Sequence, residues 1–216
     1  MMIVYYSYIN EENHCFLLEN YIDSFSSEFK QRVLRYRRWQ DAQLSLLGRL
    51  LLKKGLEECF GINHFEIGYA NNKKPFLKEL DIQFNISHAN DVVVCVLSKS
   101  NIGIDIEFID KNIDIEMFKS QMTGNEFEKV ITSVNTQQSF FTYWTEKEAV
   151  IKSHGNGLFI PLKSFEIIED VAVIDSQKFY VKKIDIDSRY KCCIATSDEK
   201  SDLEKIKLQE IDINKL

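Results

Sequence analysis

Two short segments of the sequence, 102–108 and 144–152, carry the residue types that could do chemistry. In the first, Asp105 and Glu107 alternate with isoleucines, so on a strand both carboxylates project from the same face. In the second, Glu148 interrupts an apolar stripe at helical spacing. Carboxylates that share a patch repel one another, and a hard divalent cation with oxygen ligands is the usual solution. The pattern therefore predicts a metal site.

Each segment also has an ordinary structural interpretation. An isolated Asp-x-Glu pattern is typical of the solvated face of an edge strand. Glu148 followed by Lys152 is the favourable order for a helix ion pair, which contributes only about 0.2–0.5 kcal/mol. A functional site is favoured by three further segments of the same chain, Asn72–Pro75, Phe84–His88 and Gly155–Leu158.

Together these segments resemble the 4′-phosphopantetheinyl transferases of the surfactin-synthetase-activating type. The family pattern is a lysine-proline pair, F-N-[IL]-S-H, G-I-D-[IV]-E, W-x-x-K-E-[AS]-x-x-K and a glycine-rich turn, and the match runs from about Phe29 to Leu162. The resemblance implies that the 4′-phosphopantetheine arm of coenzyme A is transferred to a serine of an acyl or peptidyl carrier protein. Adenosine 3′,5′-bisphosphate would be released, as in the reaction of holo-acyl-carrier-protein synthases.

The resemblance also implies catalytic roles. Asp105, Glu107 and Glu148 match the family's magnesium ligands, with manganese as the alternative ion. Lys152 matches the lysine that neutralises or protonates the departing phosphate. Either Glu148 or a water molecule held by Glu107 takes the serine proton, and both alternatives stay open.

Further residues are implied to contact coenzyme A, and they are Lys30, Arg32, Ser45, Lys74, Pro75, Ser87, His88 and Lys147. One position departs from the family pattern. Many relatives carry a lysine one turn before Arg32, whereas this chain has Phe29, with Lys30 as the candidate replacement. Lys147 is expected at the rim of the pocket, where surface solvation and a ligand contact are equally expected.

The charge distribution favours an anionic ligand. The formal net charge of the 216 residues is −6, yet residues 30–54 contain eight basic residues against one acidic residue, Asp41. A basic island on an acidic protein indicates that an anion is bound locally, although any one of these side chains could equally belong to a solvated helix face. Since no stacking-aromatic motif accompanies the island, we expect a phosphorylated small molecule rather than nucleic acid.

Alternation and helical spacing predict the elements that position these residues. Strands are expected over 3–9, 65–69, 84–87, 91–98, 102–109, 164–169, 178–185 and 190–196, and helices from about Ser27, over 41–59, within 114–131 and over 136–153. Residues 197–216 are expected to form a short helix or a loosely held tail. The order of strand, helix, helix and strands occurs twice without a linker, which predicts an α+β fold of two similar subdomains.

The resemblance implies a pseudo-two-fold arrangement with the active site in the cleft between the subdomains. We expect residues 1–100 to bind the phosphates and adenine of coenzyme A. Residues 101–216 should supply the metal site, the catalytic helix and the carrier-docking surface. The segment where the family docks its carrier contains Met117, Phe118, Met122 and Phe127, but at helical spacing such residues more often belong to a core.

Composition sets the remaining expectations. The chain lacks an apolar run of eighteen residues and begins without a secretory signal, so we expect a cytoplasmic protein without membrane association. A chain that contains both halves can form the cleft alone, which predicts a monomer. The expected carriers belong to nonribosomal peptide, polyketide or fatty acid synthesis. Two rival functions are a non-catalytic module that binds coenzyme A or a carrier, and a metal-dependent phosphohydrolase, which would consume coenzyme A without a carrier.

Overall fold

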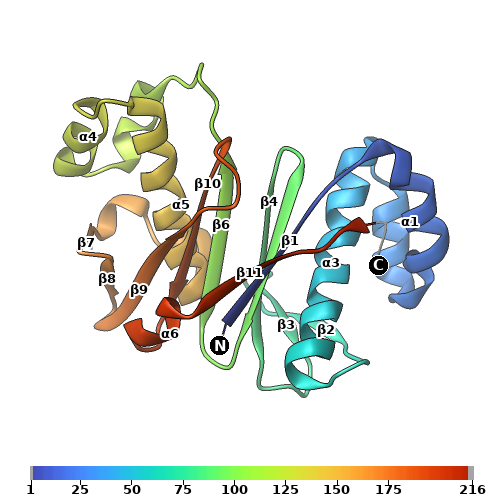
Figure 1. The fold of residues 1–216 in the computed structure, drawn as a ribbon. Helices are drawn as coiled ribbons and strands as arrows, with labels where there is room; N and C mark the ends of the chain where they lie inside the picture. Colours follow the sequence, from blue (N-terminus) through green and yellow to red (C-terminus); the bar gives the residue numbers. More distant parts are fainter. Residues whose placement is uncertain (1, 214–216) are drawn as a thin grey trace.

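The computed structural model describes residues 2–213 as two α+β halves that pack side by side (Figure 1). Each half has a β-sheet in the middle of the molecule and a long helix on the outer side of that sheet. The predicted α+β fold of two similar subdomains is therefore confirmed. Within the described residues, no helix is both long and apolar enough to cross a membrane.

The first half is built around a four-stranded sheet whose strands follow the order β11-β1-β5-β4. Its strands and helices are β1 (Met2–Tyr8), α1 (His14–Tyr21), α2 (Ser27–Leu34), α3 (Trp39–Phe60), β4 (Gln83–Ala89), β5 (Val92–Ser98) and β11 (Ile206–Glu210), with a separate hairpin of β2 (Ile67–Tyr69) and β3 (Pro75–Leu77). Helix α3 ends at Gly61, whose backbone adopts the left-handed conformation with φ of 68° that favours glycine.

The second half is built around a five-stranded sheet of order β6-β10-β9-β8-β7. Its strands are β6 (Ile102–Phe108), β7 (Ile167–Ile168), β8 (Val171–Ile174), β9 (Gln177–Ile184) and β10 (Tyr190–Thr196). Its helices are a 3₁₀ segment over Ile115–Gln121, α4 (Gly124–Ile131), α5 (Thr136–His154) and α6 (Lys200–Glu204). Helix α4 begins with a capping box between Thr123 and Glu126.

Strand β5 explains why the two halves pack as one molecule. Its apolar run is buried on both faces. Val93 and Cys95 face the core beneath α3, whereas Val92, Val94 and Val96 belong to a second core that contains isoleucines of β6. A continuous apolar strand is typical of a sheet that is covered on both sides.

The sequence pattern placed most elements correctly, and two differences have clear reasons. Strand β11 lies in the segment expected to be a short helix or a loose tail. The helix is present as α6, but the following residues run parallel to β1 in the first sheet, a long-range pairing without a local signal. The alternation of Phe108 with the isoleucines of β6 predicts a buried ring, yet Phe108 is 37% exposed because the strand ends there, and its ring packs on Tyr190.

Candidate active site

Helix α5 packs directly on β6. The carboxylates of β6 therefore point toward the helix that carries Lys152. A Cβ atom at Gly103 would overlap the carbonyl oxygen of Ala149 and the backbone nitrogen of Ser153. Only glycine permits this approach. Asp105 and Glu107 follow Gly103 at two-residue steps, so they share its face of the strand and look toward α5.

Lys152 of α5 stands at the junction of the two halves. Its Nζ atom lies 2.6 Å from Oδ1 of Asp105 and also donates to the hydroxyl of Ser87 at 3.0 Å. The Ser87 hydroxyl in turn donates to Asp105 Oδ1 at 2.9 Å. Asp105 is only 4% exposed, so the ammonium compensates a carboxylate that has lost most of its water.

Glu107 and Glu148 share a pocket with this ion pair. The pocket has a volume of about 430 Å³ and is lined by Ile86, Ser87, His88, Asp105, Glu107, Trp144, Glu148 and Lys152. Burial, helped by Asp105 and Glu148, raises the pKa of Glu107 to about 7, against the opposing effect of Lys152. Burial and Asp105 also raise the pKa of Glu148. Three carboxylates against one ammonium leave the pocket with excess negative charge.

The donor atoms of this pocket fit a hard divalent cation. The buried Oδ2 atom of Asp105 has no hydrogen-bond partner among the described residues, and the neighbouring groups Glu107 and Glu148 supply further carboxylate oxygens, which magnesium prefers. As the side chains stand, however, no group of three His, Cys, Asp or Glu residues within positions 2–213 is arranged to hold a metal ion. Binding would therefore require the glutamate side chains to turn toward Asp105.

Strand β4 brings the Phe84–His88 segment to the pocket. The side-chain oxygen of Asn85 accepts a hydrogen bond of 2.9 Å from the backbone N–H of Ile104, which ties β4 to β6. Ser87 is buried at this junction. Desolvation and the nearby Lys152 lower the pKa of His88, whereas Asp41 raises it. A neutral imidazole is thus favoured at the pocket until an anion approaches.

Lys74 reaches the same region from the β2–β3 hairpin. Its Nζ donates to the carbonyl oxygen of Lys152 at 3.2 Å, and burial lowers its pKa. The side-chain amide of Asn72 donates to the carbonyl of Gly155. Pro75 begins β3 and pairs with Tyr69. The hairpin therefore contacts the carboxyl end of α5. This contact places three residues expected from the motifs near one another: Lys74, Pro75 and Lys152.

The basic island supplies a second cluster, which the sequence analysis identified only in part. The hydroxyl of Tyr69 accepts hydrogen bonds from Arg32 and from Arg49, each at 3.1 Å. Both guanidinium groups lie over the ring of Phe29, at 5.0 and 5.2 Å from its centroid. Nη1 of Arg49 is buried without an acceptor in the part of the chain that the structure describes. Lys30 instead forms an exposed ion pair with Asp23.

Arg49 and Tyr69 are the site residues that sequence reasoning missed. Arg49 follows Ser45 by one helical turn, so the two side chains share a face of α3. The four-residue spacing from Ser45 could have indicated that Arg49 belongs to this cluster. Nothing in the sequence near Tyr69 indicates that its hydroxyl bridges two arginines, because the contact depends on how the hairpin packs against α3.

The predicted rim position of Lys147 is wrong. The side chain is 1% exposed and its ammonium lies 2.5 Å from Oε1 of Glu126. It also donates to the backbone carbonyls of Leu162 and Phe165. Lys147 lies one residue from Glu148, and on a helix adjacent residues point about 100° apart. Lys147 therefore points away from the pocket, and its burial lowers its pKa despite the opposing effect of Glu126.

The segment between β6 and α5 divides its apolar residues between core and surface. Met122 and Phe127 are buried in a core with Phe140 and Phe141, as the core interpretation predicted. Phe118 packs on the same core, whereas Met117 is 75% exposed. Only Met117 of these four is therefore fully available to a partner.

The fold and the pocket define a class of protein: a two-halved α+β protein whose carboxylates and lysines meet at the junction of the halves. Two family models cover most of the chain. The "4′-phosphopantetheinyl transferase superfamily" matches residues 101–200, and the "4′-phosphopantetheinyl transferase, N-terminal" family matches residues 16–100. The chain belongs to the 4′-phosphopantetheinyl transferase superfamily.

Curated relatives carry the same name. The chain is 40% identical to the 4′-phosphopantetheinyl transferase gsp of Aneurinibacillus migulanus over 153 residues, which are 68% of this chain and 64% of that protein. It is 28% identical to the 4′-phosphopantetheinyl transferase Sfp of Bacillus subtilis (strain 168) over 207 residues, 89% of this chain and 92% of that protein. These names favour neither rival function.

Proposed function

We propose that the protein transfers the 4′-phosphopantetheine arm of coenzyme A to a serine hydroxyl of an acyl or peptidyl carrier protein and releases adenosine 3′,5′-bisphosphate. The finer assignment is the holo-acyl-carrier-protein synthase reaction. The observation that carries this proposal is the position of Lys152, whose ammonium touches Asp105 and Ser87 in a pocket shared with Glu107 and Glu148. This arrangement combines carboxylate ligands, a cation and a candidate base, as phosphoryl transfer requires.

Lys152 is proposed as the group that neutralises or protonates the departing phosphate. Its position is supported by two oxygen contacts that hold the ammonium at the pocket wall, so little reorganisation is needed when a phosphate arrives. Glu148, or a water molecule held by Glu107, would accept the proton of the carrier serine. Both glutamates line the pocket that contains Lys152, and burial raises the pKa of Glu148, which suits a residue that accepts a proton.

A magnesium ion is the proposed cofactor, and manganese is the alternative. Asp105, Glu107 and Glu148 would hold it through oxygen atoms, which both ions accept. When bound, the ion would stabilise negative charge on the pyrophosphate of coenzyme A. The partnerless Oδ2 atom of Asp105 supports this role, because a buried carboxylate oxygen left without a partner among the described residues is costly unless a ligand supplies one.

The nucleotide end of coenzyme A is proposed to lie against residues 1–100, which form the first half apart from β11. Arg32, Ser45 and Arg49 would bind its terminal phosphate, with Arg49 in place of the lysine that Phe29 replaces. The burial of Arg49 and its partnerless Nη1 support this choice, whereas Lys30 is already paired with Asp23. His88, Ser87, Lys74 and Pro75 would complete the binding surface toward the pocket.

Three further properties concern where the protein acts, its oligomeric state and its carriers. We infer that the protein acts as a cytoplasmic monomer on carriers of nonribosomal peptide, polyketide or fatty acid synthesis. Residues 101–216 would supply the catalytic helix and the carrier-docking surface, and the exposed Met117 is a candidate contact there, since methionine adapts to several partners.

The reaction is tested by intact-protein mass spectrometry of an apo peptidyl carrier domain incubated with this protein, coenzyme A and magnesium. The expected result is a gain of one phosphopantetheine unit that a chelator abolishes and added magnesium restores. An incubation without carrier separates the rival functions, because a phosphohydrolase would consume coenzyme A there. Absence of any gain on both acyl and peptidyl carriers, with coenzyme A still bound, would support the non-catalytic module instead.

A further inference from the structure

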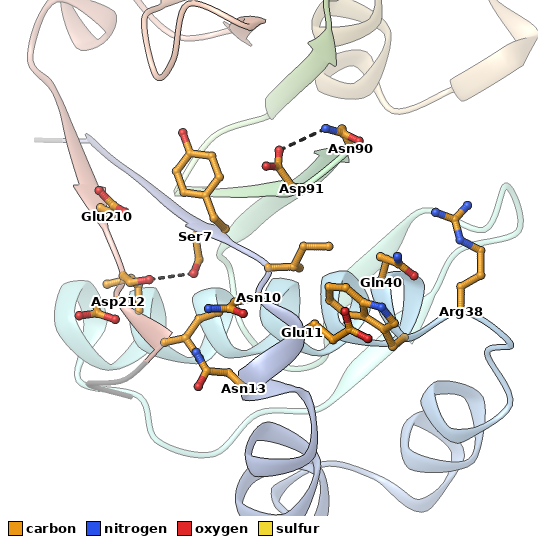
Figure 2. Close-up of a pocket in the computed structure, with 15 residues that line it drawn as sticks. Ser7, Asn10, Glu11, Asn13, Arg38, Gln40, Asn90, Asp91, Glu210 and Asp212 are labelled. Carbon is orange, nitrogen blue, oxygen red and sulfur yellow. Dashed lines mark hydrogen bonds between the residues drawn. The ribbon is translucent and has the colours of Figure 1, made fainter.

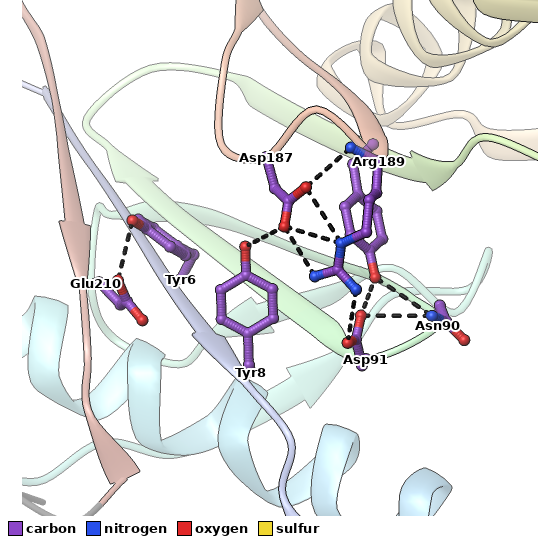
Figure 3. A network of polar contacts seen from close by, with 8 residues as sticks. Tyr6, Tyr8, Asn90, Asp91, Asp187, Arg189 and Glu210 are labelled. Atoms are coloured by element: carbon purple, nitrogen blue, oxygen red, sulfur yellow. Dashed lines mark hydrogen bonds and ion pairs between the residues drawn. The ribbon is translucent and has the colours of Figure 1, made fainter.

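A polar cluster joins the two halves beside the turn that follows β4 (Figure 3). Nη1 of Arg189 lies 3.3 Å from Oδ2 of Asp91, and the hydroxyl of Tyr190 donates to the other oxygen of Asp91. Asn90 donates to the Tyr190 hydroxyl at 3.4 Å. We call Asp91, Asp187, Arg189, Tyr190 and Tyr8 the inter-half clamp. The clamp spans 98 residues of sequence between Asp91 and Arg189.

The arginine of the clamp is itself held in place. Asp187 accepts hydrogen bonds from Nε and Nη2 of Arg189 at 3.0 and 2.8 Å on the same oxygen, and Tyr8 donates to that oxygen at 3.3 Å. Hydrogen bonds between charged groups in a fixed fork are stronger than neutral ones. Asp187 thus holds the guanidinium in an orientation that faces Asp91, and little further side-chain freedom is lost in the contact.

The clamp is connected to both walls of the active site. On one side, the carbonyl oxygen of Arg189 accepts a 2.9 Å hydrogen bond from the N–H of Ile109, which follows the strand that carries Glu107. On the other side, Asp91 lies in the two-residue turn that follows Ala89 at the end of β4, and β4 carries Ser87 and His88. The clamp therefore fixes the end of one wall against the end of the other.

Behind the turn, the described residues leave a hollow. A cavity of about 620 Å³ lies there (Figure 2), and its lining includes Tyr8, Trp39, Asn90 and Asp91. Within its own sheet, the turn is held by a 2.8 Å hydrogen bond from the N–H of Ile9 to the carbonyl of Asp91. The turn consequently has room to shift away from the second half if the clamp is removed.

We propose that Arg189 and Tyr190 are positioning residues for the active site: by holding Asp91 they set the position of Ser87 and His88 relative to Asp105 and Glu107. The clamp touches neither the pocket nor its carboxylates, so its effect passes through the β4–β5 turn. Errors of about 1 Å in the placement of reacting groups reduce rates by up to about a hundredfold. A clamp that prevents such errors contributes to rate without contacting the substrate.

The first test uses Arg189→Met, with Lys54→Met as the matched control. Lys54 belongs to the basic island but is not among the residues implied to contact coenzyme A, and it forms a surface ion pair with Glu58 within α3. Both variants therefore lose one partly exposed cation. This kinetic arm rests on the proposed function. For Arg189→Met we expect kcat to fall about tenfold and KM for coenzyme A to rise, with KM for the carrier unchanged, as a shift of one wall predicts. Lys54→Met should be indistinguishable from the wild type.

Two further variants separate positioning from a general loss of structure. Arg189→Lys keeps a cation but loses the two-nitrogen contact with Asp187, so it should recover only part of the activity. Tyr190→Phe removes only the hydroxyl that donates to Asp91 and should lower kcat less than Arg189→Met does. In a double-mutant cycle, Asp91→Ala combined with Arg189→Met should be no worse than the more impaired single variant, since both remove the same contact. Additive losses, or unchanged kcat in Arg189→Met, would overturn the proposal.

The second test does not depend on activity. The chain has four histidines, so a carbon-detected or nitrogen-detected spectrum of histidine-labelled protein gives four imidazole signals, and His88→Gln assigns one of them. We expect the His88 signal to shift in Arg189→Met and to stay in place in Lys54→Met, while the other three signals remain unchanged in both. The wild type could fail to transfer phosphopantetheine while the His88 signal still shifts in Arg189→Met. The proposed function would then be wrong, and the positioning role of the inter-half clamp would be confirmed. If the His88 signal does not shift in Arg189→Met, the positioning role of the inter-half clamp is contradicted, whatever the activity of the variant.

Discussion

The ammonium of Lys152 lies 2.6 Å from Oδ1 of Asp105, although 47 residues separate them in the sequence. This contact ties α5 to β6 and at the same time places a cation at the wall of the pocket. It leaves Oδ2 of Asp105 without a partner among the described residues. The two oxygens of Asp105 therefore have different environments: Oδ1 forms the ion pair with Lys152, and Oδ2 is available to a ligand.

Removal of Lys152 should affect both activity and stability. Lys152→Met deletes the proposed acid and leaves the buried Asp105 without its cation. We expect transfer to fall by at least a hundredfold, as general acid–base groups contribute about 10²–10⁴. The free energy of unfolding in urea should fall by about 3–5 kcal/mol, because Asp105 keeps the hydrogen bond from Ser87 but becomes a buried charge without a cation.

A double variant shows whether the loss of stability comes from the ion pair. Asp105→Asn combined with Lys152→Met removes both charges. It should unfold at a higher urea concentration than Lys152→Met alone, since removal of both partners of a buried pair costs less than removal of one. A double variant that is less stable than the single one would exclude this explanation.

We expect substitution of Arg49 to weaken the binding of coenzyme A and substitution of Lys30 to leave it unchanged. Arg49→Met should raise KM for coenzyme A about ten- to hundredfold with kcat nearly unchanged, because a hydrogen bond to a charged phosphate contributes about 1.5–3 kcal/mol. Lys30→Met should change neither value, since its ammonium is committed to Asp23 at the surface. Titration with adenosine 3′,5′-bisphosphate checks the same difference without a carrier.

The comparison with 3′-dephospho-coenzyme A identifies the group that Arg49 contacts. If Arg49 binds the terminal phosphate, the wild type should prefer coenzyme A and Arg49→Met should lose most of that preference. A larger effect of Lys30→Met than of Arg49→Met would return the missing lysine's role to Lys30.

The carboxylates and the lysine of the pocket could be predicted from local periodicity, whereas Ser87 and His88 were expected there only from the resemblance to the family motifs. Asp105 and Glu107 share a strand face at spacing two, and Glu148 and Lys152 share a helix face at spacing four. A continuous apolar run placed β5, alternation placed β6, and long helical stripes placed α3 and α5. Such signals depend only on neighbouring residues, so they persist whatever the tertiary packing.

The residues that were missed or misplaced depend on long-range packing. Lys147 shares the sequence neighbourhood of Glu148, but its direction is decided by Glu126 and by the carbonyls of Leu162 and Phe165. Strand β11 pairs with β1 across almost the whole chain. Pairings of this kind carry no periodic signal of their own, because their partners lie far away in the sequence.

Lys147 should prove essential for stability rather than for ligand binding. In Lys147→Met, Glu126 keeps its charge at 12% side-chain exposure, and two backbone carbonyls lose their donor. We expect the free energy of unfolding to fall by about 3–5 kcal/mol, the usual cost of breaking a buried pair. Addition of Glu126→Gln should restore part of it. A KM effect for coenzyme A at unchanged stability would instead return Lys147 to the pocket.

Gly103 offers a test of the packing on which the whole site depends. A methyl group in Gly103→Ala would overlap the backbone of α5 at Ala149 and Ser153, so the helix must move away from β6. Overpacking of this kind costs about 1–3 kcal/mol, and the same movement separates Lys152 from Asp105. We therefore expect both the free energy of unfolding and kcat to fall. Gly124→Ala is the matched control, because a Cβ at Gly124 meets no atom within 4 Å among the described residues. Loss of stability with full kcat would mean that the lysine keeps its place when the helix shifts, and that the approach of α5 to β6 serves the fold alone.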